Sequence, residues 1–407
     1  SKFSVGYILI VLPSSFASSL LNLLISAKQK FKRKNMSNVE VPKLRLSNNA
    51  DFMKVLRSRV SETLGQRPGK DDPKIYFKSL VIVSWMALSY FLSLYAPSTV
   101  LKLIGALSLG ISSAGLGFNL FHDAAHGSLS SNRKINKFFC FFTSSLIGPG
   151  NYFWRHKHNY LHHQFPNIQN YDDDLETRDG LRLSPEQKWS VRYKYQHIYA
   201  PLIYSLTSLE WFFIKDYVQY FSLKMNKWQS IPKMKIPDHF EFWFSKVIYY
   251  SFTVVLPLTL FSTTEFLVGF LIYHFALSLT MASIFQLAHV MEECEFPTVD
   301  EDEGKIKLGW AELQLATTVN FAPNSKFLTW FSGGLNYQVE HHIFPNISHT
   351  YYPILSTVLE KTCKEFGFPY HSLPTYKSAL FSHLNSLKKL GYHGQENSFD
   401  DAILENR

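Results

Sequence analysis

Two apolar runs, YFKSLVIVSWMALSYFLSLY at 76–95 and VLKLIGALSLGISSAGLGFNLF at 100–121, are followed at once by HDAAH at 122–126. A helix needs about 20 mainly apolar residues to cross a bilayer, and both runs have that length. Only APST separates them, so they predict a helical hairpin. The hairpin would carry two histidines, four residues apart and on one helix face, where its second helix leaves the membrane.

A second pair of apolar runs lies at 247–263 and 266–287, again with a short connector. Neither connector contains Lys or Arg, whereas residues 122–245 are rich in both. Basic residues favour the cytosolic side of a membrane protein. We therefore expect an all-α integral membrane protein, a multi-pass protein with four transmembrane helices in two hairpins and a helical cap in the cytosol.

Two further apolar runs, 138–154 and 198–214, are interrupted by Pro149, Gly150 and Pro201. Such broken runs are typical of interfacial or re-entrant helices that lie against a bilayer. Ordinary core helices of the cap would give the same pattern, so both interpretations remain open.

The composition agrees with a membrane protein that has a large water-facing part. Aromatic residues make up 16% of the 407 residues and charged residues only 18%. The net charge of +9 accompanies basic residues that flank the apolar runs, which favours anionic lipid headgroups and not nucleic acid as the partner. Three cysteines without CxxC spacing indicate a reducing compartment.

The ends of the chain divide it into an N-terminal segment 1–75, a main domain 76–392 and a polar tail 393–407. Residues 5–27 are apolar and could be a signal peptide or a further span. We favour Met36 as the true start, with residues 1–35 not native, because the motifs described here need nothing from that stretch.

The histidines form three tight groups: HDAAH at 122–126, HKHNYLHH at 156–163 and QVEHH at 338–342, with His289 near the end of the last span. Each group alone is a weak signal, since a polar helix end or a basic loop can look the same. By the predicted topology all four lie on one side of the membrane. So many imidazoles exceed the needs of one metal, which predicts a two-metal site that would suit iron, with zinc or copper also possible.

The segments HDAAHGS, WRHKHNYLHHQFPN and GGLNYQVEHHIFPNI resemble the three histidine boxes of the membrane fatty acid desaturase family. The similarity extends over residues 76–392. Gln338 stands where other members have a histidine, which resembles the front-end branch. That branch inserts a double bond between an existing one and the carboxyl end of the acyl chain.

The resemblance implies a di-iron centre that uses O₂ to insert a cis double bond into a long-chain, already unsaturated acyl-CoA or acyl-lipid. The same resemblance implies that Asp123, Asp172, Asp174 and Glu340 orient imidazoles, and that His156 lies outside the ligand pattern. The implied metal ligands are His122, His126, His158, His162, His163, His289, Gln338, His341 and His342.

The haem motif HPGG, which many front-end members carry in a fused cytochrome b5 domain, does not occur in this sequence. The expected electron donor is therefore a separate protein, cytochrome b5 with its reductase or a ferredoxin. We expect the endoplasmic reticulum membrane in a eukaryote or the inner membrane in a bacterium, with the active site in the cytosol. Alternatives are a sphingoid-base desaturase, a lipid hydroxylase or, in another class, a non-enzymatic zinc-binding membrane receptor.

Overall fold

The computed structural model describes residues 45–47, 50–65, 69–177, 179–226, 228–300 and 304–392. The predictions for residues 1–35, for Met36 and for the tail 393–407 lie outside these ranges. The described part is mainly helical, which confirms the predicted all-α class. Its strands form two small parallel pairs, β1 (Arg45–Ser47) with β2 (Lys305–Gly309) and β3 (Asn320–Phe321) with β4 (Ser372–Leu373).

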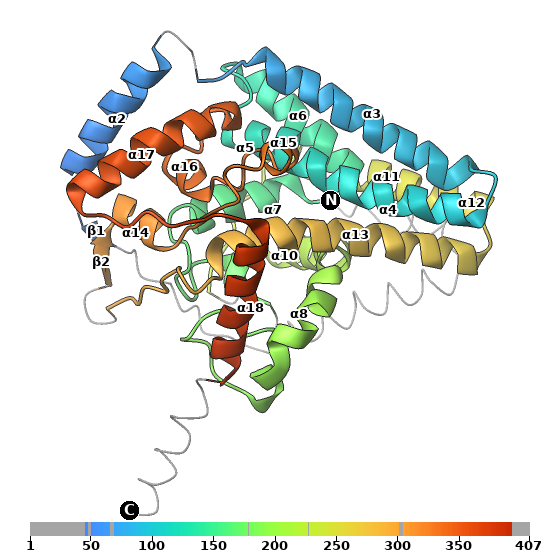
Figure 1. Ribbon diagram of the computed structural model, residues 1–407. Coiled ribbons are helices and arrows are strands. Elements are labelled where there is room, and N and C mark those ends of the chain that lie inside the picture. Colours follow the sequence, from blue (N-terminus) through green and yellow to red (C-terminus); the bar gives the residue numbers. More distant parts are fainter. Residues whose placement is uncertain are drawn as a thin grey trace, which may run out of the picture.

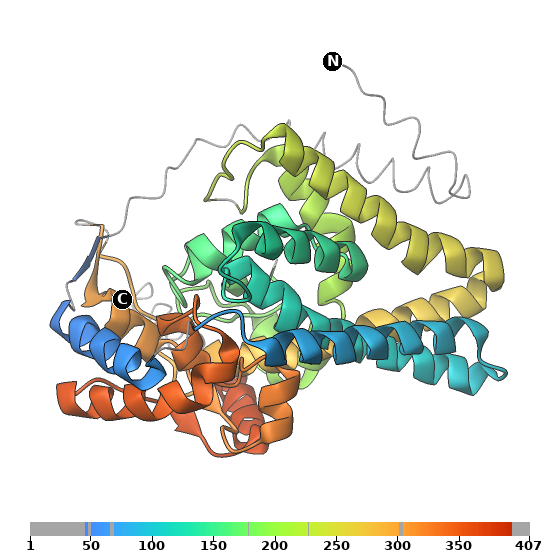
Figure 2. The same ribbon diagram turned by 90° about the horizontal axis from the view of Figure 1, so that it is seen from above.

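Four helical stretches of the described part are long and apolar enough to cross a membrane, as predicted. They form two hairpins whose turns point the same way, and most of the other elements gather at the opposite end as a helical cap (Figures 1 and 2). The stretches are α3 (Pro73–Tyr95), α4 (Thr99–Leu116) continued by η2 (Gly117–Phe121) and α5 (His122–His126), α11 (Ile236–Tyr250) continued by η7 (Ser251–Val255) and α12 (Leu256–Leu260), and α13 (Thr263–His289).

Local sequence sets the starts of the spanning helices. Asp72 precedes α3, and its side chain accepts a hydrogen bond of 2.9 Å from the Lys74 N–H. At the start of α13, Ser262 and Glu265 bond each other's backbone N–H groups and form a capping box. Such caps satisfy donors that the first helical turn leaves free, and so they define where α3 and α13 begin.

Helix α4 packs between α3 and α13. The close approach depends on Gly110, because a Cβ atom there would lie 2.4 Å from the backbone oxygen of Tyr273 on α13. Small residues allow membrane helices to approach in this way. The packing brings the end of α4 and the end of α13 to the same side of the molecule, where both enter the cap.

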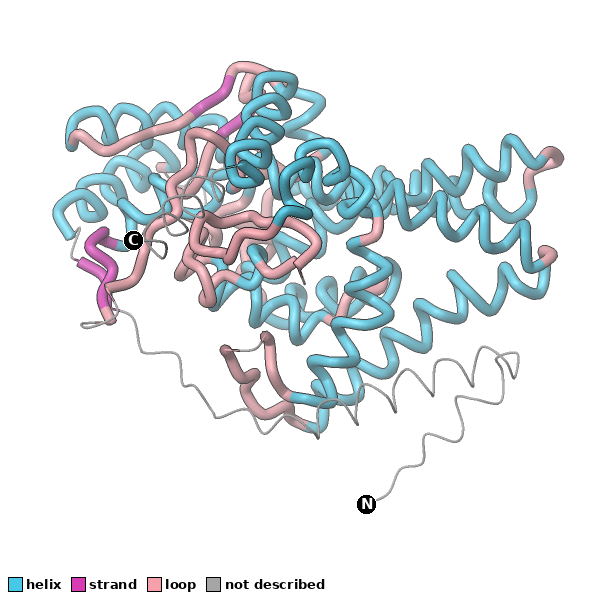
Figure 3. The backbone as a smooth tube through the Cα atoms, turned by 90° about the horizontal axis from the view of Figure 1, so that it is seen from below, coloured by secondary structure: helices cyan, strands magenta, loops and turns pink. Residues whose placement is uncertain are grey.

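The cap and the connections between the hairpins consist of short helices and long loops (Figure 3). Helices α2 and α17 pack against each other at its outer end. These remaining elements are α2 (Ala50–Leu64), α6 (Arg133–Ile147), α7 (Asn151–His156), η3 (Lys157–His162), η4 (Asp173–Leu175), η5 (Val191–Tyr195), α8 (Gln196–Ser205), α9 (Thr207–Glu210), η6 (Trp211–Lys215), α10 (Asp216–Ser222), α14 (Trp310–Ala316), α15 (Lys326–Phe331), α16 (Gln338–Ile343), η8 (His349–Tyr351), α17 (Tyr352–Phe366) and α18 (Tyr376–Tyr392).

The two interrupted runs behave differently. The first is broken between α6 and α7, where Pro149 and Gly150 were expected to break it. The break expected at Pro201 is wrong, because α8 runs through this residue. One proline removes a single backbone donor, and the packing of α8 on α13 and α18 holds the rest of the helix.

A buried ion pair ties the third spanning helix, α11, to α10. The Lys246 ammonium lies 2.6 Å from the Asp216 carboxylate, and both side chains are almost completely buried. Lys246 also donates to the backbone oxygens of Gly148 and Phe212, while Asp216 accepts from the Gly150 N–H. The charge of Lys246 is the reason why the apolar run seemed to begin at residue 247, whereas the helix begins at Ile236.

We predict that Lys246→Met lowers the free energy of unfolding by about 3–5 kcal/mol, because the substitution leaves the Asp216 carboxylate buried without its partner. Lys389→Met is the matched control, since Lys389 pairs with Glu292 on the surface and such pairs contribute about 0–1 kcal/mol. Chemical unfolding in detergent measures both variants. Equal losses in the two would contradict a special role for the buried pair.

Candidate metal centre

Four histidines from three separate segments form the first metal group. His122 and His126 lie on α5 at the end of the second span, His158 on η3 and His341 on α16. One ring nitrogen of each lies within 4.8 Å of those of the other three. The Nε2 atoms of His122 and His158 are 3.1 Å apart. This separation is too short for two unprotonated nitrogens to be neighbours without something between them or a shared proton.

Three more histidines form the second metal group: His162 of η3, His289 at the end of α13 and His342 of α16. The amide nitrogen of Gln338 lies 2.9 Å from the Nε2 atom of His289. His163 lies between the two groups, with a ring nitrogen within 4.8 Å of those of both histidines of α16. All nine residues that the resemblance implied as ligands therefore converge on one place.

A π-helical turn explains how one short segment supplies three of these rings. In η3 the backbone bonds connect residues five apart, and the His163 N–H donates to the His158 oxygen at 3.1 Å. Residues five apart then lie next to each other, and the Nε2 atoms of His158 and His163 are 3.3 Å apart. A second π turn, η2, precedes His122. Turns of this kind recur at functional sites.

The turn before α16 depends on Gly333. Its φ is +63°, and a Cβ atom there would lie 2.4 Å from the backbone oxygen of Phe118. Only glycine combines this conformation with so close an approach to the second span. The contact sets the depth at which α16 presents His341 and His342 to the cluster.

Partners outside the cluster fix the outer nitrogens of four rings. An acceptor on the far side of a ring holds the proton on Nδ1 and leaves the Nε2 lone pair facing the cluster. The Nδ1 contacts are His162 with Asp172 Oδ2 at 3.0 Å, His289 with the Thr317 backbone oxygen at 3.1 Å, His341 with the Tyr352 hydroxyl at 3.2 Å, and His342 with Gln314 Oε1 at 2.8 Å.

Four ring nitrogens of the cluster are left buried with no hydrogen-bond partner among the described residues. They are Nε2 of His126, Nδ1 of His163, Nε2 of His341 and Nε2 of His342. An unsatisfied buried polar atom costs about 1–3 kcal/mol. Divalent metal ions accept such lone pairs, so this cluster fits a metal better than it fits its own hydrogen bonding.

The charge state of four of the rings is also right for ligation. Burial, and then the neighbouring imidazoles, hold the pKa of His158, His163, His341 and His342 well below the usual range. These rings are therefore neutral near pH 7, which is the form that binds metal. Burial would also lower the pKa of His162, but Asp172 and Asp174 raise it above the usual value.

Three of the four carboxylates expected to orient imidazoles contact a ring, and Glu340 does not. Asp172 and Asp174 both contact His162. Asp123 Oδ2 instead accepts from His349 Nδ1 at 2.7 Å, while its other oxygen is 3.9 Å from His122 Nδ1. Glu340 points away from the cluster because successive helical residues face different sides, and it accepts from Asn320 and Tyr370. His156 belongs to neither metal group.

The sequence prediction missed several partners of the ligands. Gln314 and the backbone of Thr317 hold two rings of the second metal group from α14 and its end. The Thr317 contact uses a backbone oxygen, so no residue type could have indicated it from sequence. Tyr352 and His349 gave no local signal, because each meets its partner only after the chain has folded.

A family model for fatty acid desaturase matches residues 97–374. The chain belongs to the fatty acid desaturase family. It is 35% identical over 355 residues to the sn-1 linoleoyl-lipid 6-desaturase of Synechocystis sp., a match that covers 86% of this chain and 98% of the relative.

Two further relatives are an acyl-lipid (8-3)-desaturase of Physcomitrium patens and the Delta(5) fatty acid desaturase A of Dictyostelium discoideum. The first is 35% identical over 354 residues, covering 85% of this chain and 72% of the relative. The second is 30% identical over 369 residues, covering 88% and 78%. These matches confirm the resemblance to front-end desaturases. They also confirm that the protein is an oxidoreductase and a membrane protein. The hydroxylase, sphingoid-base and receptor alternatives are not favoured.

We predict that His122→Ala lowers the metal content of the purified desaturase, because it removes one ligand of the first metal group. His156→Ala should leave the content unchanged, since His156 lies two residues before His158 on the same segment but outside both groups. Elemental analysis of the two proteins measures this difference. Equal metal contents would refute the assignment of His122.

We also predict that Gly333→Ala lowers the free energy of unfolding by at least about 1 kcal/mol, the cost of holding a non-glycine residue in the left-handed conformation. The clash with Phe118 adds to this cost. Gly269→Ala is the control, because a Cβ atom there meets nothing within 4 Å and alanine favours the helix. Thermal unfolding of both variants tests the prediction, which fails if Gly333→Ala is as stable as the control.

Proposed function

We propose that this desaturase holds two iron ions, one in each metal group, and uses O₂ as its oxidant. The observation that carries the proposal is the set of buried ring nitrogens without hydrogen-bond partners at the centre of the cluster. Bound iron supplies the power to oxidise an unactivated methylene, which no side chain has. The proposed ligands are His122, His126, His158 and His341 for one iron, His162, His289, His342 and Gln338 for the other, and His163 between them.

The chain's own residues hold and orient this centre. Asp172, Gln314 and Tyr352 fix rings from outside, so that a bound metal meets ligands already in position. The ligand side chains are nearly all buried, so water is largely excluded from the reacting atoms. Gln338, only 1% exposed, contributes a neutral and weaker donor through its amide.

The proposed substrate is the acyl chain of a membrane lipid. Two of the named relatives are a linoleoyl-lipid 6-desaturase and an acyl-lipid (8-3)-desaturase. We infer a long, already unsaturated chain that receives a cis double bond between its existing double bond and the carboxyl end. An acyl-CoA substrate is the alternative carrier.

Electron balance requires a further protein. Reduction of one O₂ to two waters takes four electrons and four protons, and the two C–H bonds of the substrate supply only two of each. A separate one-electron carrier, cytochrome b5 with its reductase or a ferredoxin, supplies the remaining electrons. The basic residues beside the spanning helices support a cap in the cytosol. We infer that the spans lie in the endoplasmic reticulum membrane of a eukaryote or in the inner membrane of a bacterium.

Expression in a host without polyunsaturated lipids, fed defined mono- and diunsaturated fatty acids, tests the function directly. We expect a product with one added cis double bond on the carboxyl side of the existing one, located by mass spectrometry. His158→Ala should abolish this product because it removes a ligand, whereas His156→Ala should retain it. The purified enzyme should contain iron.

Two results would contradict the proposal. A hydroxylated lipid in place of a new double bond would assign the scaffold to a hydroxylase. A protein with zinc and no iron, and with no lipid product, would favour the receptor. If the His158→Ala variant still formed the product, this result would refute the proposed ligand set but not the proposed reaction.

A further inference from the structure

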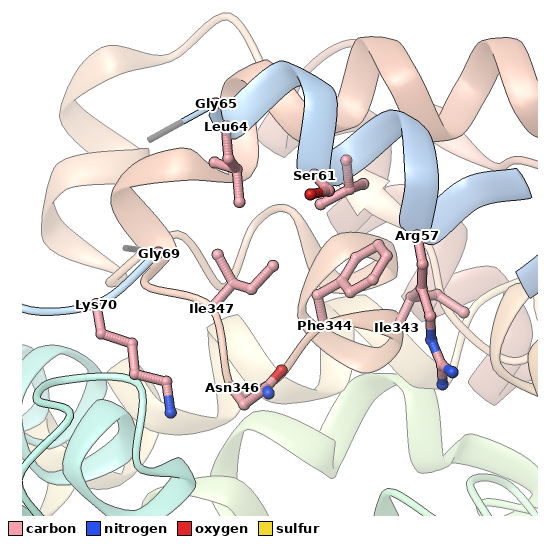
Figure 4. Close-up of a pocket in the computed structure, with 11 residues that line it drawn as sticks. Arg57, Ser61, Leu64, Gly65, Gly69, Lys70, Ile343, Phe344, Asn346 and Ile347 are labelled. Carbon is pink, nitrogen blue, oxygen red and sulfur yellow. The ribbon is translucent and has the colours of Figure 1, made fainter. Parts of the chain in front are cut away.

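An open pocket of about 480 Å³ lies between α2 and the segment that follows α16. Its apolar wall includes Ile343 and Phe344, and its polar lining includes Arg57, Lys70 and Asn346. Figure 4 shows the ends of Arg57 and Lys70 pointing to the same side of the pocket, with Asn346 between them. The pocket therefore presents two cations and an amide at its mouth.

Neither cation has an ion-pair partner within 4.0 Å in the described part of the chain. Arg57 and Lys70 form no ion pair with a described residue, and Arg57 is exposed. Asp71, next to Lys70 in sequence, interacts with it electrostatically, but the Asp71 carboxylate accepts its hydrogen bonds from the Ser130 hydroxyl and the Ser131 N–H. The positive field at the mouth is thus available to an anionic partner.

The walls of the pocket are attached to the rest of the cap. Helix α2 packs on α17 through Phe52 and Leu56, and Arg59 bonds Glu365 at 2.6 Å. On the other side the Ser348 N–H donates to the Gly69 oxygen at 2.7 Å. A partner would therefore meet a preformed surface.

One wall of the pocket adjoins the metal centre. Ile343 and Phe344 directly follow His342 in sequence, so the Phe344 Cα lies within about 8 Å of the His342 Cα. The wall is closed, since Ile343 and Phe344 are 4% and 7% exposed and His342 is completely buried. A closed wall prevents an acyl chain from reaching the metals from this side, whereas electrons pass through a short stretch of packed protein.

The position of the pocket also argues against a lipid. Helices α2 and α17 lie at the end of the molecule opposite the hairpin turns (Figure 1). The spanning helices begin beyond them, so this end projects away from the bilayer. Its partner is then a protein approaching from water.

We propose that this pocket docks the reduced one-electron carrier, and that a carboxylate on the carrier's acidic surface enters between Arg57 and Lys70. The inference rests on the proposed function, because it needs a metal centre that accepts electrons. For each double bond formed, two carriers are oxidised by one electron each. These electrons, with two protons from water and the two hydrogens of the substrate, reduce one O₂ to two waters.

Association measurements test the docking surface. The double variant Arg57→Glu/Lys70→Glu, in lipid nanodiscs, is compared with Lys361→Glu/Lys364→Glu, an equal charge change at exposed positions of α17 outside the pocket. The probes are soluble cytochrome b5 and a [2Fe–2S] ferredoxin at low and physiological salt. We expect the pocket variant to lose about 10-fold or more in association rate at low salt with at least one carrier, and the control to change little.

Three outcomes decide the proposal. Equal association rates for the two variants with both carriers overturn it. Unchanged carrier binding with reduced binding to vesicles of anionic phospholipid also overturns it, and assigns the pocket to a lipid surface. Supporting it requires slower association at an unchanged unfolding temperature, together with retained desaturation when dithionite replaces the carrier. Wild-type protein that gives no product with either electron source would instead refute the proposed function.

Discussion

The constraint on which the rest of the structure depends is that buried imidazole nitrogens cannot satisfy one another. Four rings direct their Nδ1 atoms to acceptors outside the cluster, which leaves lone pairs facing inward. Two of these, Nε2 of His341 and of His342, have no partner among the described residues. The close packing of α4 on α13, the π turns and the glycine turn before α16 all serve to hold these nitrogens in one small volume.

The parts of the fold that could be predicted from sequence are those encoded locally. Apolar length and short connectors indicated four spans in two hairpins, and the described helices agree. The start of the third span could not be found in this way, because Lys246 looks like a charge at a membrane boundary. Its partner Asp216 lies 30 residues earlier, and only the folded chain brings the two together.

The candidate site likewise has features that the sequence predicts and features that appear only in the folded chain. The histidine clusters were visible as short motifs, and the structure gathers all of them. A spacing of four predicted an α-helical face for His158 and His162, but the π turn also makes His158 and His163 neighbours. The outer partners Gln314 and Tyr352 belong to other elements, so no pattern near the histidines could indicate them. Glu340 is the opposite case. It is next to His341 in sequence, but its side chain bonds Asn320 and Tyr370 and not a ring of the cluster.

The proposed ligands belong to segments that are far apart in the chain, from α5 to α16. Under the proposed assignment, metal ions bind the folded cap and not the unfolded chain, so each ion ties these segments together. Binding to the native state alone adds to stability by mass action. The amount of folded enzyme in a cell then depends on metal supply as well as on synthesis, since an unloaded cap opens more often to proteolysis.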